Sequence, residues 1–172
     1  LKLICNIYLC KYVSNHKLIK SNKMTNNKKV AIVMGSQSDY AVMKKCEEIL
    51  KVLKIKFETK IVSAHRTPER MFTFAKKAAK NNFAVIVAGA GGSAHLPGMI
   101  ASISILPVIG VPVETKKLKG LDSLLSIVQM PKGIPVGTVA IGENGAFNAG
   151  LMAASIIALS DIKIKKNLEK WR

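Results

Sequence analysis

The chain has 172 residues, of which 49% are apolar and 22% charged, which is typical of a single globular domain. The formal net charge is +17, but six lysines and no acidic residue lie in residues 1–28. The remainder lacks the arginine-rich or aromatic-interleaved patches of nucleic-acid-binding proteins, and no apolar run reaches the roughly 18 to 20 residues of a membrane span. We therefore expect neither a nucleic-acid nor a membrane partner.

The first segment, residues 1–28, begins without methionine and reaches Met24 shortly before the first clear strand. Its apolar stretch is interrupted by Lys11, and no small-residue cleavage site follows, which disfavours a secretory signal. We interpret residues 1–28 as a disordered or non-native leader. A main domain is expected over residues 29–160, followed by a C-terminal helix or tail over residues 161–172.

The three cysteines form neither a closed disulfide set nor a paired CxxC zinc pattern. This use of cysteine fits a reducing compartment, so we expect a cytoplasmic protein. Cys46 falls on the apolar face of a predicted helix, which indicates a small core residue rather than a nucleophile.

Apolar runs and helical periodicity alternate along the rest of the chain. Val30 to Met34 is apolar without alternation, which is typical of a strand buried on both faces. Strands are predicted over residues 29–34, 57–62, 83–88, 107–113 and 136–141. Helices are predicted over residues 42–53, 68–80, 97–104, 121–129 and 146–159. Right-handed crossovers then give a flavodoxin-like α/β three-layer sandwich, with a five-stranded parallel sheet in the order 2-1-3-4-5.

Two helix starts carry recognisable caps. Ser38 or Asp39 is placed to cap the first helix, and Thr67 before Pro68 is placed to cap the second. The helix over residues 146–159 has no charged residue and is apolar nearly all round. Such a helix must be covered on more than one side, so we expect it to pack against another subunit, with residues 161–172 reaching across. The alternative is a well-buried internal helix.

A first polar motif, residues 35–39, joins the first strand to the first helix. Free backbone N–H groups and the helix dipole favour an anion at such a turn. The motif lacks the second glycine of a dinucleotide loop and the lysine of a triphosphate loop, so a single phosphate is the better expectation. Asp39 either accepts hydrogen bonds from sugar hydroxyls or serves only as a cap.

A second polar motif, residues 63–68, ends the second strand. Arg66 beside an anion-binding turn suggests a bidentate phosphate clamp. The neighbouring His65 is suited to taking and giving a proton near neutrality, and its place in a strand-end loop favours a catalytic role over a structural one.

A third polar motif, residues 89–98, follows the third strand and is rich in glycine. Its small residues suit the close approach of a flat ligand to main-chain donors. For His95 we favour a helix-capping or packing role. No metal cluster is apparent, and no Ser-His-Asp set can be identified.

These motifs closely resemble those of the bacterial carboxyaminoimidazole ribonucleotide mutase family of purine biosynthesis. The matching segments are residues 30–36 with 38–39, 63–68, 88–99, 110–113, 126–131 and 140–142. They run in collinear order over about residues 29–160. The resemblance implies a flavodoxin-like fold, a homo-octamer with active sites at subunit junctions, and no metal or organic cofactor. It also implies an isomerase that moves a carboxylate from the exocyclic nitrogen to a ring carbon of aminoimidazole ribonucleotide, by release and recapture of carbon dioxide.

The resemblance carries specific roles to residues of this chain. It places the substrate phosphate and ribose against Ser36, Asp39 and Arg66, with Ser38 and Ser63 nearby.

His65 matches the family's general acid and base. Ala90, Gly91 and Leu96 would wrap the imidazole and its carboxylate. Ser93 stands where many relatives carry alanine, a small departure from the pattern.

Two other functions remain open from the sequence. One is the related enzyme that carboxylates aminoimidazole ribonucleotide directly with carbon dioxide, whose pocket motifs differ from those at residues 65–68 and 129–131. The other is a non-catalytic flavodoxin-like module that carries a flavin or receives a phosphoryl group. The turns lack both the flavin-sandwiching aromatics and the paired acids that a phosphoryl receiver needs for magnesium.

Overall fold

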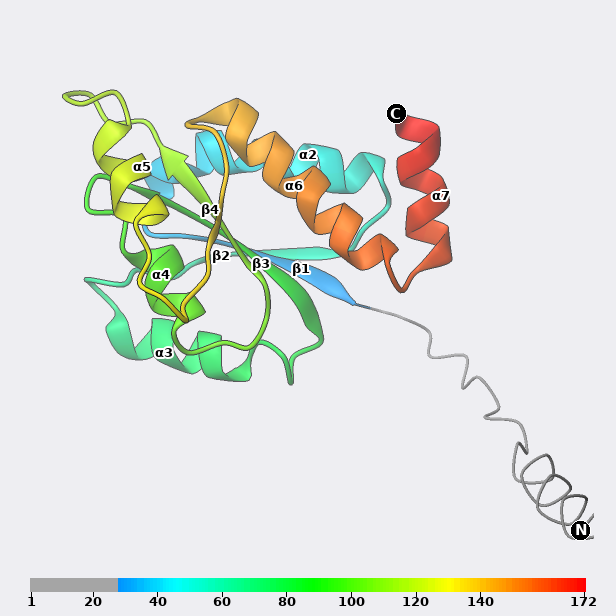
Figure 1. Cartoon of the computed structure of the whole chain (residues 1–172), viewed down its shortest axis with the longest axis horizontal. Helices are drawn as coiled ribbons and strands as arrows, with labels where there is room; N and C mark the ends of the chain where they lie inside the picture. Colours follow the sequence, from blue (N-terminus) through cyan, green and yellow to red (C-terminus); the bar gives the residue numbers. More distant parts are fainter. Residues whose placement is uncertain (1–27) are drawn as a thin grey trace, which may run out of the picture.

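A computed structural model describes residues 28–172 of the chain (Figure 1). The expected leader therefore lies outside the described residues, apart from Lys28. The sheet has five parallel strands in the order β2-β1-β3-β4-β5, and the predicted order 2-1-3-4-5 is confirmed. The strands are β1 (Lys29–Met34), β2 (Phe57–Ile61), β3 (Phe83–Gly91), β4 (Val108–Val113) and β5 (Gly137–Thr138).

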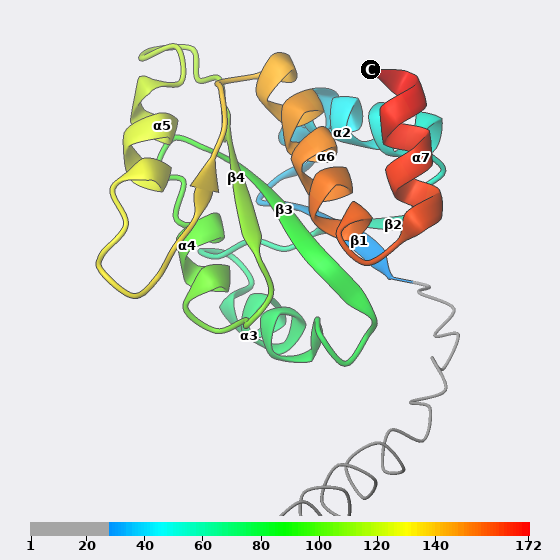
Figure 2. The same ribbon diagram turned by 45° about the vertical axis from the view of Figure 1, so that its right-hand side comes forward.

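Helices cover both faces of this sheet, as the two views in Figures 1 and 2 show. On one face lie α2 (Tyr40–Val52), α6 (Glu143–Ala158) and α7 (Ile162–Trp171). On the other lie α3 (Pro68–Lys77), α4 (Leu96–Ala101) and α5 (Leu121–Val128). A short 3-10 turn, η1 (Gln37–Asp39), precedes α2. The three-layer flavodoxin-like sandwich is thus the observed architecture.

Alternate side chains of each central strand enter different cores. In β1, Val30 and Ile32 join the core under α2 and α6, whereas Ala31 and Val33 join the core above α3 and α4. This alternation follows from the two-residue repeat of a strand, and burial on both faces explains why β1 is apolar throughout.

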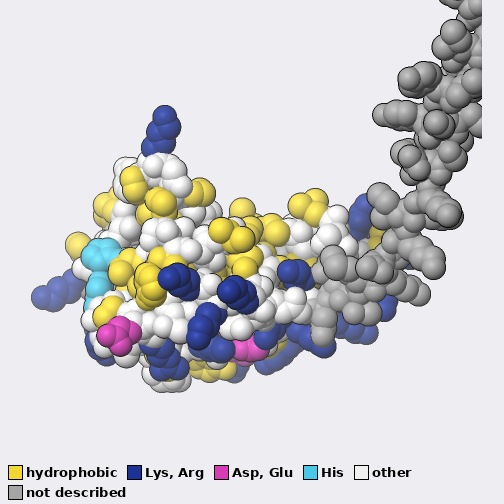
Figure 3. Space-filling view, turned by 90° about the horizontal axis from the view of Figure 1, so that it is seen from below, with side chains coloured by type: hydrophobic (Ala, Val, Ile, Leu, Met, Phe, Trp, Pro, Cys, Tyr) yellow, Lys and Arg dark blue, Asp and Glu magenta, His cyan; other side chains and the backbone are white. Residues whose placement is uncertain are grey.

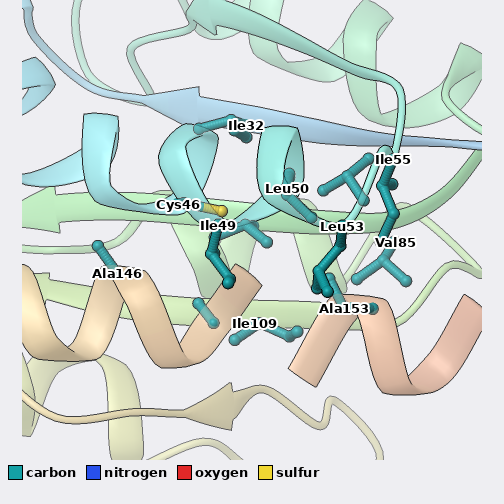
Figure 4. Close-up of a cluster of buried hydrophobic side chains, with 14 of the residues drawn as sticks. Ile32, Cys46, Ile49, Leu50, Leu53, Ile55, Val85, Ile109, Ala146 and Ala153 are labelled. Carbon is teal, nitrogen blue, oxygen red and sulfur yellow. The ribbon is translucent and has the colours of Figure 1, made fainter. Parts of the chain in front are cut away.

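Cys46 lies in the first of these two cores (Figure 4). Its side chain is fully buried, and burial, with a smaller effect from the neighbouring Glu47, raises the pKa of its thiol to about 12. The predicted structural role of Cys46 is confirmed, because a thiol that stays protonated is a poor nucleophile.

The fifth strand is much shorter than expected. A strand was predicted over residues 136–141, but only Gly137 and Thr138 pair with β4. Beyond them the backbone follows β4 less regularly, through hydrogen bonds from Val139 N to Gly110 O (3.1 Å) and from Gly142 N to Pro112 O (2.9 Å). The segment lies at the edge of the sheet, where no further strand holds it in register.

Helix α6 packs closely on α2 through small residues. Its buried residues are Gly145, Ala146, Ala149, Gly150, Ala153, Ala154 and Ile157. A Cβ atom at Gly150 would lie 2.4 Å from Ile49 Cγ2, which shows how near the two helices approach. On the other side of α6, Met152 remains 45% exposed in the single chain, and Leu159 beyond its end is 88% exposed. One side of α6 is therefore buried inside the chain, as the alternative of a well-buried internal helix predicted. For the exposed side, burial against another subunit stays a prediction.

Residues 162–171 form helix α7, which packs on α6 of the same chain. Ile164 and Leu168 are each 8% exposed, and the rings of Trp171 and Phe147 lie 6.1 Å apart. The Asn167 side chain donates to Leu53 O at 3.0 Å and joins α7 to the end of α2. The structure thus places this segment against its own chain, and a reach across a subunit interface stays a prediction. Within residues 28–172, no helix combines the length and the apolar character needed to cross a bilayer.

Candidate active site

A cavity of about 680 Å³ lies at the rim formed by the carboxyl ends of the parallel strands. Parallel α/β sheets place ligands at this rim, next to the point where the strand order reverses. Here that point lies between β1 and β3. The cavity is lined by all nine residues expected to act at the site: Ser36, Ser38, Asp39, Ser63, His65, Arg66, Ala90, Gly91 and Leu96.

The turn after β1 is held by a reciprocal cap. The Ser36 side chain accepts from Ser38 N at 3.4 Å, and Asp39 Oδ2 accepts from Ser36 N at 3.1 Å. The expected cap by Ser38 or Asp39 on the first helix is therefore wrong. Ser36 caps the short 3-10 turn that precedes α2, and Asp39 has no side-chain cap bond to α2. The extra turn shifts the cap three residues upstream.

Asp39 is only 8% exposed at the base of this turn. Burial raises the pKa of its carboxyl above the ordinary value, although hydrogen bonds from Ser36 and Ser38 and the charge of Arg66 oppose the shift. A carboxylate held this way is positioned to accept hydrogen bonds from a ligand hydroxyl.

The loop after β2 brings Arg66 to the first turn. Arg66 Nη2 donates to Gly35 O at 3.1 Å, and Ser63 Oγ accepts from Arg66 N at 3.2 Å. The Thr67 hydroxyl donates to Ser63 O at 3.1 Å and accepts from Ser63 N at 3.2 Å. Thr67 does precede α3, but its hydroxyl closes the 63–67 turn instead of making the cap bond that was predicted. The guanidinium and the β1 turn thus face one space, where an anion could meet both.

His95 contacts His65, and its observed place differs only in part from the capping or packing role favoured from the sequence. It occupies the N-cap position of α4 without making a side-chain cap bond. Instead its Nδ1 lies 2.8 Å from Nε2 of His65, with the two rings edge to face. Both side chains are exposed, and Figure 3 shows histidines at the surface at one end of the molecule, next to acidic and basic side chains.

A separation of 2.8 Å between two ring nitrogens fits one shared proton. One ring donates and the other accepts, so the pair holds at most one proton more than two neutral imidazoles. Which ring donates depends on the tautomers of the two histidines.

The glycine-rich segment begins inside the sheet. Ala90 and Gly91 are the last two residues of β3, which runs three residues further than predicted. Gly92 follows with φ +68°, a left-handed conformation that glycine adopts without strain. Leu96 opens α4 and is 2% exposed, so it forms the floor of the cavity and also part of the core.

The segment after β4 also lines the cavity and was not predicted from the sequence. It contributes Glu114, Thr115 and Lys116, next to Val113 at the end of β4. The placement of loops at the carboxyl ends of parallel strands, which identified the other three motifs, applies equally to β4. The segment was missed because it has no glycine-rich or histidine-containing motif.

The geometry brings a guanidinium, serine hydroxyls and two imidazoles together around one cavity. Arg66 and the serine turn lie on the β1 and β2 side, and the histidine pair joins the β2 loop to the β3 loop. Among the described residues, no group of three or more histidine, cysteine or acidic side chains is arranged to hold a metal ion. The arrangement suits acid and base chemistry on a phosphorylated substrate.

Comparisons with known proteins point to one family. A family model described as AIR carboxylase (AIRC) matches residues 29–172. The chain is 55% identical over 147 residues to the N5-carboxyaminoimidazole ribonucleotide mutase of Escherichia coli K12, covering 86% of this chain and 87% of the relative. It is 58% identical over 144 residues to the protein of the same name from Thermotoga maritima, covering 84% and 83%.

A solved structure agrees with the sequence relatives. PurE from Treponema denticola superposes with a TM-score of 0.75 at 28% identity, covering 84% of this chain and 89% of that one. Since the family model spans the main domain and the C-terminal helix, the chain belongs to the AIR carboxylase (AIRC) family.

Proposed function

We propose that this chain is an N5-carboxyaminoimidazole ribonucleotide mutase of purine biosynthesis. Relatives of that name share 55% or more of their residues with it over most of both chains. The observation that carries the proposal is the convergence of Arg66, the serine turn and His65 on one cavity. The substrate has a phosphate to hold and a proton to exchange, and these groups match both needs.

The ribonucleotide phosphate would lie against Ser36, Ser38 and Arg66. Hydroxyl and guanidinium donors suit its oxygens, and a planar guanidinium can bind two of them at once. Asp39 would accept from the ribose hydroxyls, with Ser63 holding the Arg66 backbone in place. This placement directs the base of the nucleotide toward β3 and the histidines.

The aminoimidazole would lie against Ala90, Gly91 and Leu96. Ala90 and Gly91 have little or no side chain, so a flat ring can approach the main chain there. Lys116 and Glu114 border the same cavity from the β4 side. The carboxylate would thus move within a space walled mainly by small residues and backbone.

His65 would act as both acid and base. Protonated His65 gives its proton to the carbamate nitrogen, the N–C bond breaks, and carbon dioxide leaves. The ring carbon then attacks carbon dioxide, and neutral His65 takes the proton from that carbon. Acid and base catalysis of this kind contributes about 10²- to 10⁴-fold. Holding carbon dioxide beside the ring carbon adds the advantage of a high effective concentration.

His95 would orient the His65 ring through a hydrogen bond between the two ring nitrogens. While its Nδ1 accepts from His65 Nε2, it fixes which His65 nitrogen carries hydrogen and how the ring is turned. His65 itself returns to its protonated state at the end of the cycle, because the proton taken from the ring carbon replaces the one given to the carbamate nitrogen.

The direct carboxylase is the second candidate, since the matching family model carries that description. It would take carbon dioxide from solution rather than from the substrate, so added bicarbonate would be required for turnover. The non-catalytic binding module has less support, because no Phe, Tyr or Trp lines the cavity to stack on a flavin.

We infer further that the chain assembles with itself, as an octamer. The support is apolar surface left uncovered in the single chain at Met152, Leu159 and, on α5, Leu121 and Leu125. Large apolar side chains left this exposed are candidate contacts with other subunits.

The proposal is tested by replacing His65 with asparagine. The His65→Asn variant keeps a side chain of similar size but cannot transfer a proton. Substrate binding, measured by calorimetry at a temperature where turnover is slow, should change less than fivefold, while turnover should fall at least 10²-fold. Turnover near that of the wild type would refute the acid and base role.

A further inference from the structure

Ser123 is a fully buried polar residue beside the cavity. It lies in the first turn of α5 and has no exposed surface. Its hydroxyl donates to Val113 O at 2.7 Å and accepts from Gly92 N at 2.9 Å. Both capacities of the hydroxyl are therefore used on main-chain groups outside its own helix.

The two groups that Ser123 joins lie at the ends of two neighbouring strands beside the cavity. Val113 ends β4, and Gly92 follows the end of β3, where the two strands cease to pair. Both residues line the cavity. The Ser123 side chain thus links the two strands just beyond their last backbone pair. At this point the chain leaves the sheet through Gly92, which has φ +68°.

The turn that Ser123 holds leads directly to His95. Ala94 N donates to Gly92 O, and His95 N donates to Ser93 O, each at 2.8 Å. The path from Gly92 to His95 is therefore short and tightly bonded. At its end, His95 Nδ1 lies 2.8 Å from His65 Nε2, so a shift of the turn changes this distance directly.

We propose that Ser123 is a positioning residue for the reaction, fixing the glycine-rich turn so that His95 meets His65 at hydrogen-bond distance. The proposal rests on the proposed function, because it assigns Ser123 an effect on the proton transfer described there. Ser123 itself does not line the cavity, so it acts through Gly92 and His95 and not on the substrate.

Ser126 provides a matched comparison. It lies one turn further along α5, and its hydroxyl also approaches the turn, at 3.3 Å from Gly92 O. However, Gly92 O already accepts from Ala94 N, and the Ser126 hydroxyl donates at 2.7 Å to Asp122 O in its own helix. Removing the Ser126 hydroxyl leaves no backbone group of the turn without a partner. Removing the Ser123 hydroxyl takes away the acceptor of Gly92 N–H.

The experiment compares Ser123→Ala and Ser126→Ala with the wild type, at a temperature well below the melting point of each. For Ser123→Ala we expect kcat to fall about 10- to 100-fold with KM changed less than threefold, since a displacement of about 1 Å at a reacting group can cost 10²-fold. A crystal structure of this variant should show the His65–His95 nitrogen distance beyond 3.5 Å. Ser126→Ala should keep that distance and lose less than twofold in kcat.

The outcomes separate this inference from the proposed function. Ser123→Ala with wild-type kcat, or with the histidine pair unchanged, would overturn the positioning role while leaving the mutase assignment intact. Equal losses in both variants would also overturn it, because the effect would then belong to helix α5 in general. If the wild type itself does not turn over, the proposed function fails, and the histidine distance still reports whether Ser123 holds the turn.

Discussion

At the scale of single residues, local surroundings decide what otherwise ordinary side chains do. His65 and Arg66 are neighbours in sequence, yet Arg66 reaches the β1 turn while His65 meets His95 from the β3 loop. The two side chains therefore serve different halves of the cavity, one the anion and one the proton.

Asp39 yields a prediction with a definite pH dependence. Because burial raises its pKa in the folded chain above the unfolded value, the folded state binds more protons between those two values. The carboxyl therefore opposes folding once the pH exceeds its folded pKa, and this penalty disappears below about pH 4. We expect Asp39→Asn to raise Tm at pH 7 by up to about 3 °C, because the amide oxygen can still accept from Ser36 N.

The same variant should bind the ribonucleotide less well, because a neutral amide is a weaker acceptor than a carboxylate. Calorimetric melting at pH 7 and at pH 4, together with KM, checks both parts. A lower Tm than the wild type at pH 7 would show that the charge of Asp39 stabilises the fold.

Most of the site could be predicted from residue types at strand ends, but one partner could not. His65, Arg66 and the serine turn combine chemistry with position, so the sequence marks them. His95 gave no such signal, because the sequence does not show that two loops separated by 30 residues bring its ring to His65. The first cap was expected at Ser38 or Asp39 but lies at Ser36, because a 3-10 turn precedes α2. Thr67 stands at the N-cap of α3 as expected, but its hydroxyl closes the 63–67 turn instead of making a cap bond.

At the scale of elements, the buried strands were the most predictable part of the fold. The apolar runs of β1 and β3 are long and unbroken, because both faces of these strands are covered. The edge strand β5 was overestimated. Val136 to Ile141 has strand-forming residues, yet with β4 on only one side, regular pairing holds for two residues.

The packing of α6 on α2 gives a prediction at this scale. Gly150→Ala adds a Cβ 2.4 Å from Ile49 Cγ2 and 3.2 Å from Cys46 O, so the helices must separate. We expect a loss of about 1 to 3 kcal/mol in the free energy of unfolding, although alanine is the better helix former by about 1 kcal/mol. Urea denaturation measures the change.

Ser155→Ala is the control on the same helix. The Ser155 hydroxyl bonds only to Leu151 O within α6, so its removal should alter the unfolding free energy by less than about 1 kcal/mol. Equal stability of Gly150→Ala and the wild type would contradict the close approach of the two helices.

At the scale of the whole molecule, the single chain leaves its apolar surface unevenly covered. The side of α6 that faces α2 is closed by small residues, while Met152 on that helix stays 45% exposed. We expect light scattering to give a mass near eight times the 18.6 kDa of one chain. Met152→Lys should shift the distribution to smaller species, because it places a charge in the expected contact.

A monomer at micromolar concentration would contradict this expectation. The exposed apolar side of α6 would then face solvent instead of another subunit. The sequence predicted the need for that cover from the absence of charge along residues 146–159, but the number of subunits came only from the family resemblance.

We propose above that one cavity moves a carboxylate within a single ribonucleotide. The most direct measurement incubates the chain with N5-carboxyaminoimidazole ribonucleotide in buffer containing ¹³C-bicarbonate and follows the carboxylate of the product by mass spectrometry. We expect turnover whose rate does not depend on bicarbonate, with most of the product unlabelled. Turnover only with added bicarbonate, and a fully labelled product, would contradict it.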